Sequence, residues 1–498
     1  NQWVYGSSTI SNIHYRYRLT GTDEAINVGT TTFTLSGVSG VSTGDISNAE
    51  LYYDFNSDGE IATSSSSVST SLDGSLAYLF SLLIDEENDA VYAGQGWTTG
   101  EGDLFICKPE SIVTGDGDGI CELGEWENSF LGSEESIQSL IKDDLNEVIY
   151  FGQGSDTGSG DIYYCQPLVS GDADGFCEEG EWSLSYDGSE EFIYSLTIDP
   201  LNGTVYAGQA SGYADADIYA CQPLVSGDAD GICEDGEWSL SYDGTDYYVY
   251  SLLTDTVNGV IYTGLYTSAA GNSDIYSCQP LVSGDADGVC ENLEWSLSYD
   301  GSQYGVESLE IDSTNGVIYA GLHGTSGAGD IYKCAPLVDG DADGTCEDGE
   351  WSLAYNGVTD RIPSLVFDQN SGVLYAGERK ITATDGDIRS CRPSVSGDAD
   401  GLCEDGEWSL FYDGPNETIQ SLAFDRKHNV LYAGQGYSTG DGDVLYYSFG
   451  DSQIASDGVV SITGANGTIT FATSTPYYQP IGNNDYLLKM TVGGIANT

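Results

Sequence analysis

Apolar and polar residues alternate with a period of two along most of the chain, which is the pattern of half-buried β-strands. The pattern is clearest in residues 193–244, where it reads IYSLTID, TVYAGQ, DIYAC and EWSLSYDG. An Asn-Gly pair between the first two segments is typical of a β-hairpin turn. We therefore predict four short strands in this stretch, the first two joined as a hairpin.

Seven copies of this pattern follow one another at a spacing of 56 to 58 residues. Each copy has a Ser-Leu pair in its first predicted strand: Ser81-Leu82, Ser139-Leu140, Ser195-Leu196, Ser251-Leu252, Ser308-Leu309, Ser364-Leu365 and Ser421-Leu422. Seven successive units of four strands are what a seven-bladed β-propeller requires. An open solenoid is the alternative architecture.

The two ends of the repeat region favour the propeller. The seventh copy ends after three strands, at residues 444–450, and lacks the segment equivalent to EWSLSYDG. A matching segment, SSVSTSLDGS, precedes the first copy at residues 66–75. We predict that this N-terminal strand completes the last blade and closes the ring, which removes the exposed edges of an open array.

The sequences on either side of the repeats alternate as well, but they lack the repeat. They contain six strand signals: NIHYRYRL, TTTFTLSG, AELYYDF, GVVSITG, GTITFAT and DYLLKMTV. Each flank alone is too short for a comfortable core, whereas together they suffice for a β-sandwich. The predicted fold is therefore all-β, with the propeller (65–450) inserted into a discontinuous β-sandwich domain (1–64 and 451–498).

The charge of the chain is strongly acidic, with 80 Asp and Glu against 13 Lys and Arg and a formal net charge of −67. This balance excludes ordinary nucleic-acid binding, which needs a basic surface, and it disfavours anionic membranes. No apolar run approaches the ~18 residues of a membrane span, so we expect no membrane insertion. Such a charge repels itself unless cations neutralise it, and the alternative is an acidic surface that serves solubility.

Twelve cysteines fall into six pairs, one in each complete copy, separated by 14 residues once and by 12 residues five times. The pairs are Cys107 with Cys121, Cys165 with Cys177, Cys221 with Cys233, Cys278 with Cys290, Cys334 with Cys346, and Cys391 with Cys403. No CxxC motif or neighbouring His indicates zinc. We predict six disulfides within blades and hence an extracellular or cell-surface protein. The chain opens without a signal-peptide pattern, as the mature form of a secreted protein would.

An acidic loop lies within each cysteine pair, with the pattern D-x-D-G-x-C-E-x-x-E-W. Two Asp, a nearby carbonyl and a later Glu are oxygen ligands of the kind that Ca²⁺ takes. We predict about six Ca²⁺ ions, with plain Asp-Gly turns as the alternative. The predicted ligands are Asp116, Asp118, Glu122, Glu125, Asp172, Asp174, Glu178, Glu181, Asp228, Asp230, Glu234, Glu237, Asp285, Asp287, Glu291, Glu294, Asp341, Asp343, Glu347, Glu350, Asp398, Asp400, Glu404 and Glu407.

Three further sets of residues are candidates for a metal site, for packing or turns, and for glycosylation. Asp54, Asn56 and Asp58 form a related loop before the closing strand, which is a candidate seventh calcium site. A Trp recurs at one position of every complete copy, and this repetition favours a role in packing between blades over a role in stacking against sugars. An Asp precedes each third predicted strand, and we interpret it as a turn residue and not as a ligand. Asn202, Asn416 and Asn466 lie in N-x-T sequons, the acceptor motif for glycans on an extracellular protein.

The repeat resembles known families in its motifs. SLxxDxxNGxxYAG followed by GDIYxC is similar to the YVTN or lactonase-like propellers of secreted prokaryotic surface proteins. The acidic loops resemble the start of EF-hand loops, although the third loop Asp and the Glu at position twelve are absent. The flanks resemble β-sandwich modules of large prokaryotic surface proteins. These resemblances imply a surface or appendage protein and no particular activity.

Signs of an enzyme are few. His14, His323 and His428 are scattered, and no nucleophile, zinc or phosphate-loop motif is present. We predict a non-enzymatic structural protein that polymerises with copies of itself in a filament or appendage. The alternatives are an adhesin that binds glycans and, third, a hydrolase that uses a pair of carboxylates.

The first ten residues, NQWVYGSSTI, provide a hypothesis for assembly. Trp3, Val4 and Tyr5 precede a Ser-rich stretch and offer apolar side chains for the groove of a neighbouring subunit. Donor-strand pairing of this kind is heterologous and generates an open filament. The same segment pairs equally well within its own domain, so both alternatives stay open.

Overall fold

The computed structural model describes most of the repeat region and the strands of both flanks. The described residues are 10–21, 26–36, 46–54, 68–74, 78–96, 102–109, 119–132, 136–154, 160–171, 174–188, 192–210, 216–227, 229–244, 248–266, 273–284, 287–301, 305–324, 329–340, 342–357, 361–369, 371–379, 386–393, 400–414, 418–436, 442–449, 452–455, 459–463, 466–479 and 482–492. Every regular element among them is a β-strand, so none forms a helix with the length and hydropathy of a membrane span.

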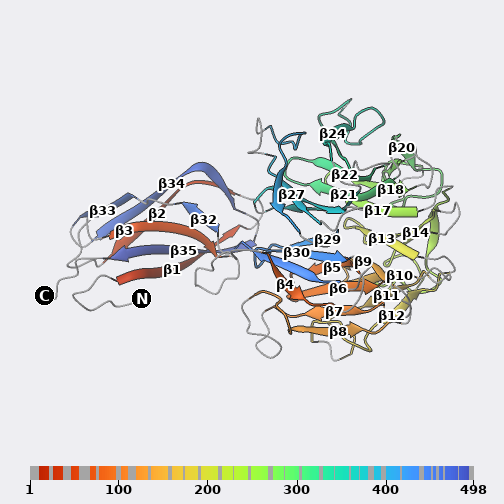
Figure 1. Cartoon of the computed structure of the whole chain (residues 1–498), viewed down its shortest axis with the longest axis horizontal. Helices are drawn as coiled ribbons and strands as arrows, with labels where there is room; N and C mark the ends of the chain where they lie inside the picture. The colour runs from red at the N-terminus through yellow and green to blue at the C-terminus, as the bar shows by residue number, and fades with distance from the viewer. Residues whose placement is uncertain are drawn as a thin grey trace. The chain divides into compact units, whose positions relative to one another are not determined.

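The repeat region is built from short strands in the order that the sequence pattern predicts (Figure 1). The strands are β4 (Ser69–Leu72), β5 (Tyr78–Asp85), β6 (Ala90–Gly96), β7 (Leu104–Cys107), β8 (Trp126–Phe130), β9 (Ser136–Asp143), β10 (Val148–Gly154), β11 (Ile162–Cys165), β12 (Ser183–Tyr186), β13 (Phe192–Asp199), β14 (Thr204–Ala210), β15 (Ile218–Cys221), β16 (Ser239–Tyr242), β17 (Tyr248–Asp255), β18 (Val260–Tyr266), β19 (Ile275–Cys278), β20 (Ser296–Tyr299), β21 (Gly305–Asp312), β22 (Val317–His323), β23 (Ile331–Cys334), β24 (Ser352–Tyr355), β25 (Arg361–Asp368), β26 (Val373–Arg379), β27 (Ile388–Cys391), β28 (Ser409–Tyr412), β29 (Thr418–Asp425), β30 (Val430–Gly436) and β31 (Val444–Ser448).

Each blade is an antiparallel sheet of four successive strands, as β13 to β16 illustrate. Leu196 of β13 lies opposite Ala207 of β14, and the next pairings join β14 to β15 and β15 to β16. The strand succession closes on itself because β4 pairs with β31, with Leu72 opposite Val444. The segment before the first copy thus supplies the fourth strand of the last blade, and the repeat region is an all-β propeller.

The tight hairpin between the first two strands of a blade depends on a buried Asp. In the β5–β6 hairpin, Asp85 Oδ1 accepts hydrogen bonds from the backbone N–H groups of Glu87 and Asn88, and its Oδ2 accepts one from the Asn88 amide. Equivalent bonds recur at Asp143, Asp255 and Asp312. These bonds satisfy the turn backbone, which explains the D-x-x-N pattern of the repeat.

The hydrophobic core lies between adjacent blades. Tyr150 and Ile162 of one blade pack with Ile193 and Val205 of the next, and all four side chains are fully buried. The Tyr of the YAG motif is among the largest buried side chains in six blades: Tyr92, Tyr150, Tyr206, Tyr262, Tyr319 and Tyr432. The continuous apolar run VYAG therefore marks a second strand that is covered on both faces.

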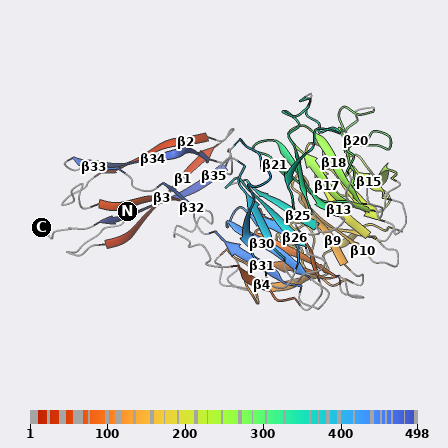
Figure 2. The ribbon, with the colours of Figure 1, turned by 45° about the horizontal axis from the view of Figure 1, so that its top comes forward.

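The flanking segments form two antiparallel sheets. One has the order β1 (Ile10–Gly21), β35 (Gly482–Val492), β3 (Ile46–Asp54), β32 (Ser452–Ala455), and the other has the order β2 (Ile26–Ser36), β34 (Asn466–Gln479), β33 (Val459–Thr463). Strands from the beginning of the chain pair with strands from its end, for example β1 with β35 and β2 with β34. Figure 2 shows these strands in a second view.

The prediction of six flanking strands was one strand too low for the described residues. The additional strand is β32, of which the residues SQIA are too few and too polar to alternate visibly.

The chain forms two compact units whose bounds are close to those of the predicted domains. Residues 1–67, 426–430 and 447–498 belong to one unit, and residues 68–425 and 431–446 belong to the other.

Candidate functional site

Six disulfides connect the third strand of a blade to the acidic loop that follows it. The bonds join Cys107 to Cys121, Cys165 to Cys177, Cys221 to Cys233, Cys278 to Cys290, Cys334 to Cys346, and Cys391 to Cys403. All twelve side chains are buried, and no described cysteine is free, so none is a thiolate ligand for a metal. The prediction of disulfides within blades is confirmed for every pair, and six such bonds fit an oxidising compartment.

The second Asp stabilises the loop backbone in the five acidic loops in which the structure describes this residue. Asp174 Oδ1 accepts a hydrogen bond of 3.0 Å from the N–H of Phe176. Gly175 donates its N–H to the carbonyl of Pro167 and has a φ of 100°, a conformation that glycine adopts without strain. The same Asp bond recurs at Asp230, Asp287, Asp343 and Asp400. One carboxylate oxygen of each second Asp is therefore engaged in the loop itself.

The second Glu of each loop reaches back to the start of the motif. Glu181 Oε2 accepts a hydrogen bond of 2.9 Å from the N–H of Glu178, while Oε1 occupies the position that a Cβ on Gly171 would take. Gly171 immediately precedes Asp172, the first predicted ligand. The same close approach occurs between Gly227 and Glu237, between Gly284 and Glu294, and between Gly340 and Glu350. The fold thus brings the last carboxylate of the motif to the Gly that precedes the motif in these four loops.

The first Glu of the loop has a different partner. Lys108 Nζ lies 2.6 Å from Glu178 Oε1, and Lys333 Nζ lies 2.8 Å from Glu404 Oε1. In the blade that closes the ring, Tyr446 donates a hydrogen bond of 2.6 Å to Glu122. Each of these contacts joins the loop to the preceding blade. At these positions the first Glu bridges two blades, while the second Glu turns inward to the loop.

The predicted calcium ligands are only partly within the described residues. Asp116, Asp118, Asp172, Asp228, Asp285, Asp341, Asp398, Asn56 and Asp58 lie outside them, and the side chain of Asp54 does as well. Among the described residues alone, no three carboxylate, His or Cys side chains converge as a metal site. The donor types nevertheless fit Ca²⁺, since every candidate ligand is an oxygen, and in four loops the second Glu lies against the Gly that precedes the leading Asp in the sequence.

A repeated set of hydrogen bonds fixes each loop to the preceding blade. The buried N–H of Cys177 donates to the Tyr92 hydroxyl at 3.0 Å, and Ser129 Oγ donates to the Cys177 carbonyl at 2.5 Å. Trp182 Nε1 in turn donates to Ser129 Oγ at 3.1 Å. The Trp therefore packs between blades, as predicted. Burial raises the pKa of Tyr92, to which the negative charges of Asp85, Asp174 and Glu181 also contribute.

The same bond to a Tyr hydroxyl recurs in the other loops. The N–H of the second cysteine is the donor each time, and the Tyr belongs to the second strand of a neighbouring blade. The donors and acceptors are Cys233 with Tyr150, Cys290 with Tyr206, Cys346 with Tyr262, and Cys403 with Tyr319. The second cysteine of each disulfide is therefore held both by its sulfur and by its backbone.

The closing blade makes the same contacts. Cys121 donates its N–H to Tyr432 at 3.0 Å, and Trp126 Nε1 donates to Ser71 Oγ of β4 at 3.0 Å. Ser71 in turn donates to the carbonyl of Cys121. The N-terminal strand thus takes the chemical role that the fourth strand has in the other blades.

Two other sets of residues have structural roles. The Asp before the third strand accepts a hydrogen bond from the N–H of the Gly after the fourth strand, as in Asp161 with Gly188 and Asp443 with Gly74. Its side chain therefore joins two strands of one blade, which differs from the predicted role in a local turn. In the sequon at Asn202, the amide nitrogen donates to the Gly288 carbonyl at 2.6 Å, so a glycan on that nitrogen would displace this bond. Asn416 lies outside the described residues, as does the side chain of Asn466.

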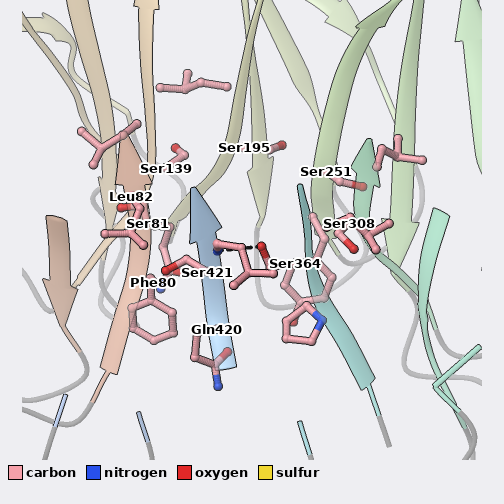
Figure 3. A pocket seen from close by; sticks show the side chains of 18 of the residues that line it. Phe80, Ser81, Leu82, Ser139, Ser195, Ser251, Ser308, Ser364, Gln420 and Ser421 are labelled. Atoms are coloured by element: carbon pink, nitrogen blue, oxygen red, sulfur yellow. Dashed lines mark hydrogen bonds between the residues drawn. The ribbon is translucent and has the colours of Figure 1, made fainter. Parts of the chain in front are cut away.

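The Ser-Leu pairs line a cavity of about 220 Å³ that lies among the first strands of the blades and is open to solvent (Figure 3). Ser81 Oγ donates to the Ile137 carbonyl of the next blade at 3.2 Å, and Ser421 Oγ donates across the closing junction to the Leu79 carbonyl at 3.2 Å. Ser364 differs, because its hydroxyl accepts the N–H of Leu422 at 2.8 Å, the dashed line in Figure 3. The hydroxyls satisfy backbone carbonyls that an inner sheet edge would otherwise leave without partners.

Sequence reasoning did not identify this cavity, although the recurring Ser-Leu pair was its signal.

Sequence reasoning also missed a cluster of charged and aromatic side chains that occurs in one part of the ring and is not repeated. Arg361 Nη1 lies 2.8 Å from Glu307 Oε1, His323 Nδ1 lies 3.4 Å from the same oxygen, and His323 stacks on Tyr266. Glu307 is only 7% exposed, so its charge is compensated within the protein.

Comparisons with known proteins identify no relative in sequence: no family and no curated protein matches. Among solved structures, the chain is similar to one in a nidogen/laminin complex, with 13% identity, 60% of this chain and 92% of that chain covered, and a TM-score of 0.37. It is similar to hydrazine synthase of Kuenenia stuttgartiensis, with 10% identity, coverages of 74% and 95%, and a TM-score of 0.49. A third is the Cps50 (Swd1) β-propeller domain of Myceliophteria thermophila, with 10% identity, coverages of 76% and 98%, and a TM-score of 0.46. Because these TM-scores are low, the assignment of an all-β propeller rests on the pairing of the strands themselves.

Proposed function

We propose that this chain is a calcium-stabilised, extracellular structural protein, a non-enzymatic subunit of a filament or surface appendage. We infer seven blades for its repeat region, since the 28 described strands from β4 to β31 divide into seven sets of four. The proposal that this propeller is of the YVTN or lactonase-like kind rests on the resemblance of the repeat motifs alone. The two flanking sheets form a β-sandwich into which the propeller is inserted. One observation supports the structural role above all: the disulfide-closed acidic loop is bonded to the preceding blade in the same way around the ring.

Calcium fits this arrangement because the loops concentrate negative charge next to the contacts between blades. The ion would be held by the first Asp of the motif and by the second Glu, with EF-hand-like carbonyl ligands from the loop backbone. It would neutralise carboxylates that otherwise repel one another. The protein's own residues hold the loop in place: the disulfide joins its two ends, and the Tyr hydroxyl and the Trp fix the end at the second cysteine on the preceding blade.

Assembly through the flanking domain is supported by its strand order. Among the described strands, β1 and β2 are outermost in their sheets and pair on one side only, and they are 12 and 11 residues long. An outer strand of this length is a template for a strand from another chain. The segment that contains Trp3, Val4 and Tyr5 precedes β1 directly and lies outside the described residues. Donor-strand exchange through this segment and its pairing within one subunit remain the two alternatives.

Electron microscopy of the purified protein with and without residues 1–10 tests the proposal. We expect filaments of the full chain, and we expect a folded, monodisperse propeller without filaments after the deletion. Monodisperse full-length protein at high concentration in CaCl₂ would contradict the role as a filament subunit. Filaments that persist after the deletion would leave the structural role intact and would exclude donor-strand exchange through this segment.

A further inference from the structure

Among the residues that the structure describes, no charged side chain lines the cavity formed by the Ser-Leu pairs. Its 19 lining residues are Ser, Leu, Gln, Phe, Tyr and Pro, in a chain of which 19% of the residues are charged, so about four charged residues would be expected by chance. An ionic ligand would find no opposite charge among these residues with which to form a charge-assisted hydrogen bond. The cavity therefore disfavours ionic ligands of either sign, and the net charge of −67 disfavours anions further.

One lining position differs among the repeats, while its neighbours remain constant. The residue before the Ser-Leu pair is, in chain order, Phe80, Gln138, Tyr194, Tyr250, Glu307, Pro363 and Gln420. Five of these seven line the cavity. The acidic member of the set, Glu307, does not line it and is paired with Arg361 instead. The repeated Ser-Leu pairs therefore give the cavity a uniform wall, and the residues at this variable position give it side chains of different chemistry on different blades.

The two Gln side chains are held in a defined orientation. Gln138 Nε2 donates to Ser136 Oγ at 2.8 Å, and Gln420 Nε2 donates to Thr418 Oγ1 at 2.8 Å. Each amide keeps an oxygen acceptor and a second N–H donor for a ligand. Figure 3 shows the ring of Phe80 and the amide of Gln420 on the same side of the serines. Aromatic faces beside fixed amide groups suit a ligand that has both apolar C–H surfaces and hydroxyl groups.

We propose that this cavity binds a neutral, polyhydroxylated ring: one uncharged monosaccharide unit, either free or at the end of a glycan. The hydroxyl groups of a sugar both donate and accept hydrogen bonds, and the Gln amides of the lining do the same. The Ser hydroxyls of the lining donate their protons to backbone carbonyls, so their oxygens are left to accept hydrogen bonds from a sugar. The size agrees, because about 220 Å³ is smaller than the ~300–1,000 Å³ of sites for drug-sized ligands and admits one ring. This binding activity goes beyond the structural role and does not depend on filament formation.

Ligand-observed NMR and calorimetry with the full chain test the proposal. The probes are the methyl glycosides of glucose, galactose, mannose, N-acetylglucosamine and N-acetylgalactosamine, together with glucuronate and glucosamine as charged counterparts. We expect saturable binding of at least one neutral glycoside, at one site per chain, and binding of its charged counterpart at least tenfold weaker. A glycan array distinguishes the two sources, because a site for glycan ends binds immobilised glycans that carry the same terminal sugar.

Matched substitutions locate the site. Gln138→Met and Gln420→Met keep the length of the side chain and remove the amide, so each should weaken binding roughly fivefold. Gln369→Met provides the control, because Gln369 is exposed and lies outside the cavity, and affinity should not change. If the Gln138→Met protein does not fold, Gln420→Met alone decides. Absence of binding by every neutral probe at 10 mM, equal affinity for charged probes, or equal affinity of the Gln420→Met and Gln369→Met proteins would each overturn the proposal.

Discussion

The substitution Tyr432→Phe tests whether the junction that closes the ring is as strong as the other junctions between blades. The Tyr432 hydroxyl accepts the N–H of Cys121 at 3.0 Å, and Tyr206 accepts the N–H of Cys290 at 3.0 Å in the ring interior. Both tyrosines are fully buried. Each substitution removes the acceptor and leaves a buried N–H without a partner, which costs about 1–3 kcal/mol. The account therefore predicts similar losses in the free energy of unfolding for Tyr432→Phe and Tyr206→Phe.

Urea unfolding with intact disulfides, followed by tyrosine and tryptophan fluorescence, measures both losses. Tyr164→Phe is the control, because its hydroxyl lies in an exposed contact of 3.4 Å with Glu234, and its loss should be within about 0.5 kcal/mol of zero. A loss for Tyr432→Phe that equals the control, beside a loss of more than ~1 kcal/mol for Tyr206→Phe, would refute equivalent closure. In that case β4 would be a loosely attached strand.

Two further predictions concern the acidic loops and the buried Asp residues. Gly171→Ala should abolish one calcium site in a calorimetric titration, because the added Cβ displaces the Glu181 carboxylate. Gly180→Ala is the control and should retain every site, because Gly180 also has a positive φ but no atom lies within 4 Å of the added Cβ. Equal calcium stoichiometry in both variants would contradict the role of Glu181. Burial raises the pKa of Asp143, Asp199 and Asp312 in the folded protein, so their contribution to stability is present below the unfolded pKa of about 3.9 and is lost as the pH rises through the folded pKa. In a buffer with chelator, the Tm should therefore rise as the pH falls from 7 towards 4. In a buffer with CaCl₂, the Tm should fall over the same pH range, because protons compete with Ca²⁺ for the carboxylates. The same trend of Tm in both buffers would count against this interpretation.

The sequence predicted those parts of the molecule that repeat. The strand pattern, the disulfides and the closing strand are visible because each occurs many times, or because its absence in one copy is matched by a segment elsewhere. The short strand β32 was missed because four residues show no periodicity. The partners of the first Glu could not be predicted, because Lys108 and Lys333 lie about 70 residues away and only the packing of blades brings them to Glu178 and Glu404.

The cavity shows a different limit. Its Ser-Leu lining repeats and was visible in the sequence, but the residues that give it chemical character vary among the copies. Phe80, Gln138 and Gln420 look like random variation in an alignment of the repeats, and only the ring places them around one space. The leading Asp of each acidic loop is predicted by pattern alone, and the Glu181 carboxylate at Gly171 adds an independent reason to expect an ion there.

The most direct test of the central claim is the melting temperature of the full chain before and after removal of calcium. An ion that binds only the folded protein stabilises it by mass action, by about 4 kcal/mol per site when its concentration is 1,000 times Kd. Calorimetry in CaCl₂ and in chelator, with metal content verified by elemental analysis, should show a large fall in Tm that added CaCl₂ reverses and NaCl of equal ionic strength does not. An unchanged Tm in protein shown to be free of metal would contradict the account.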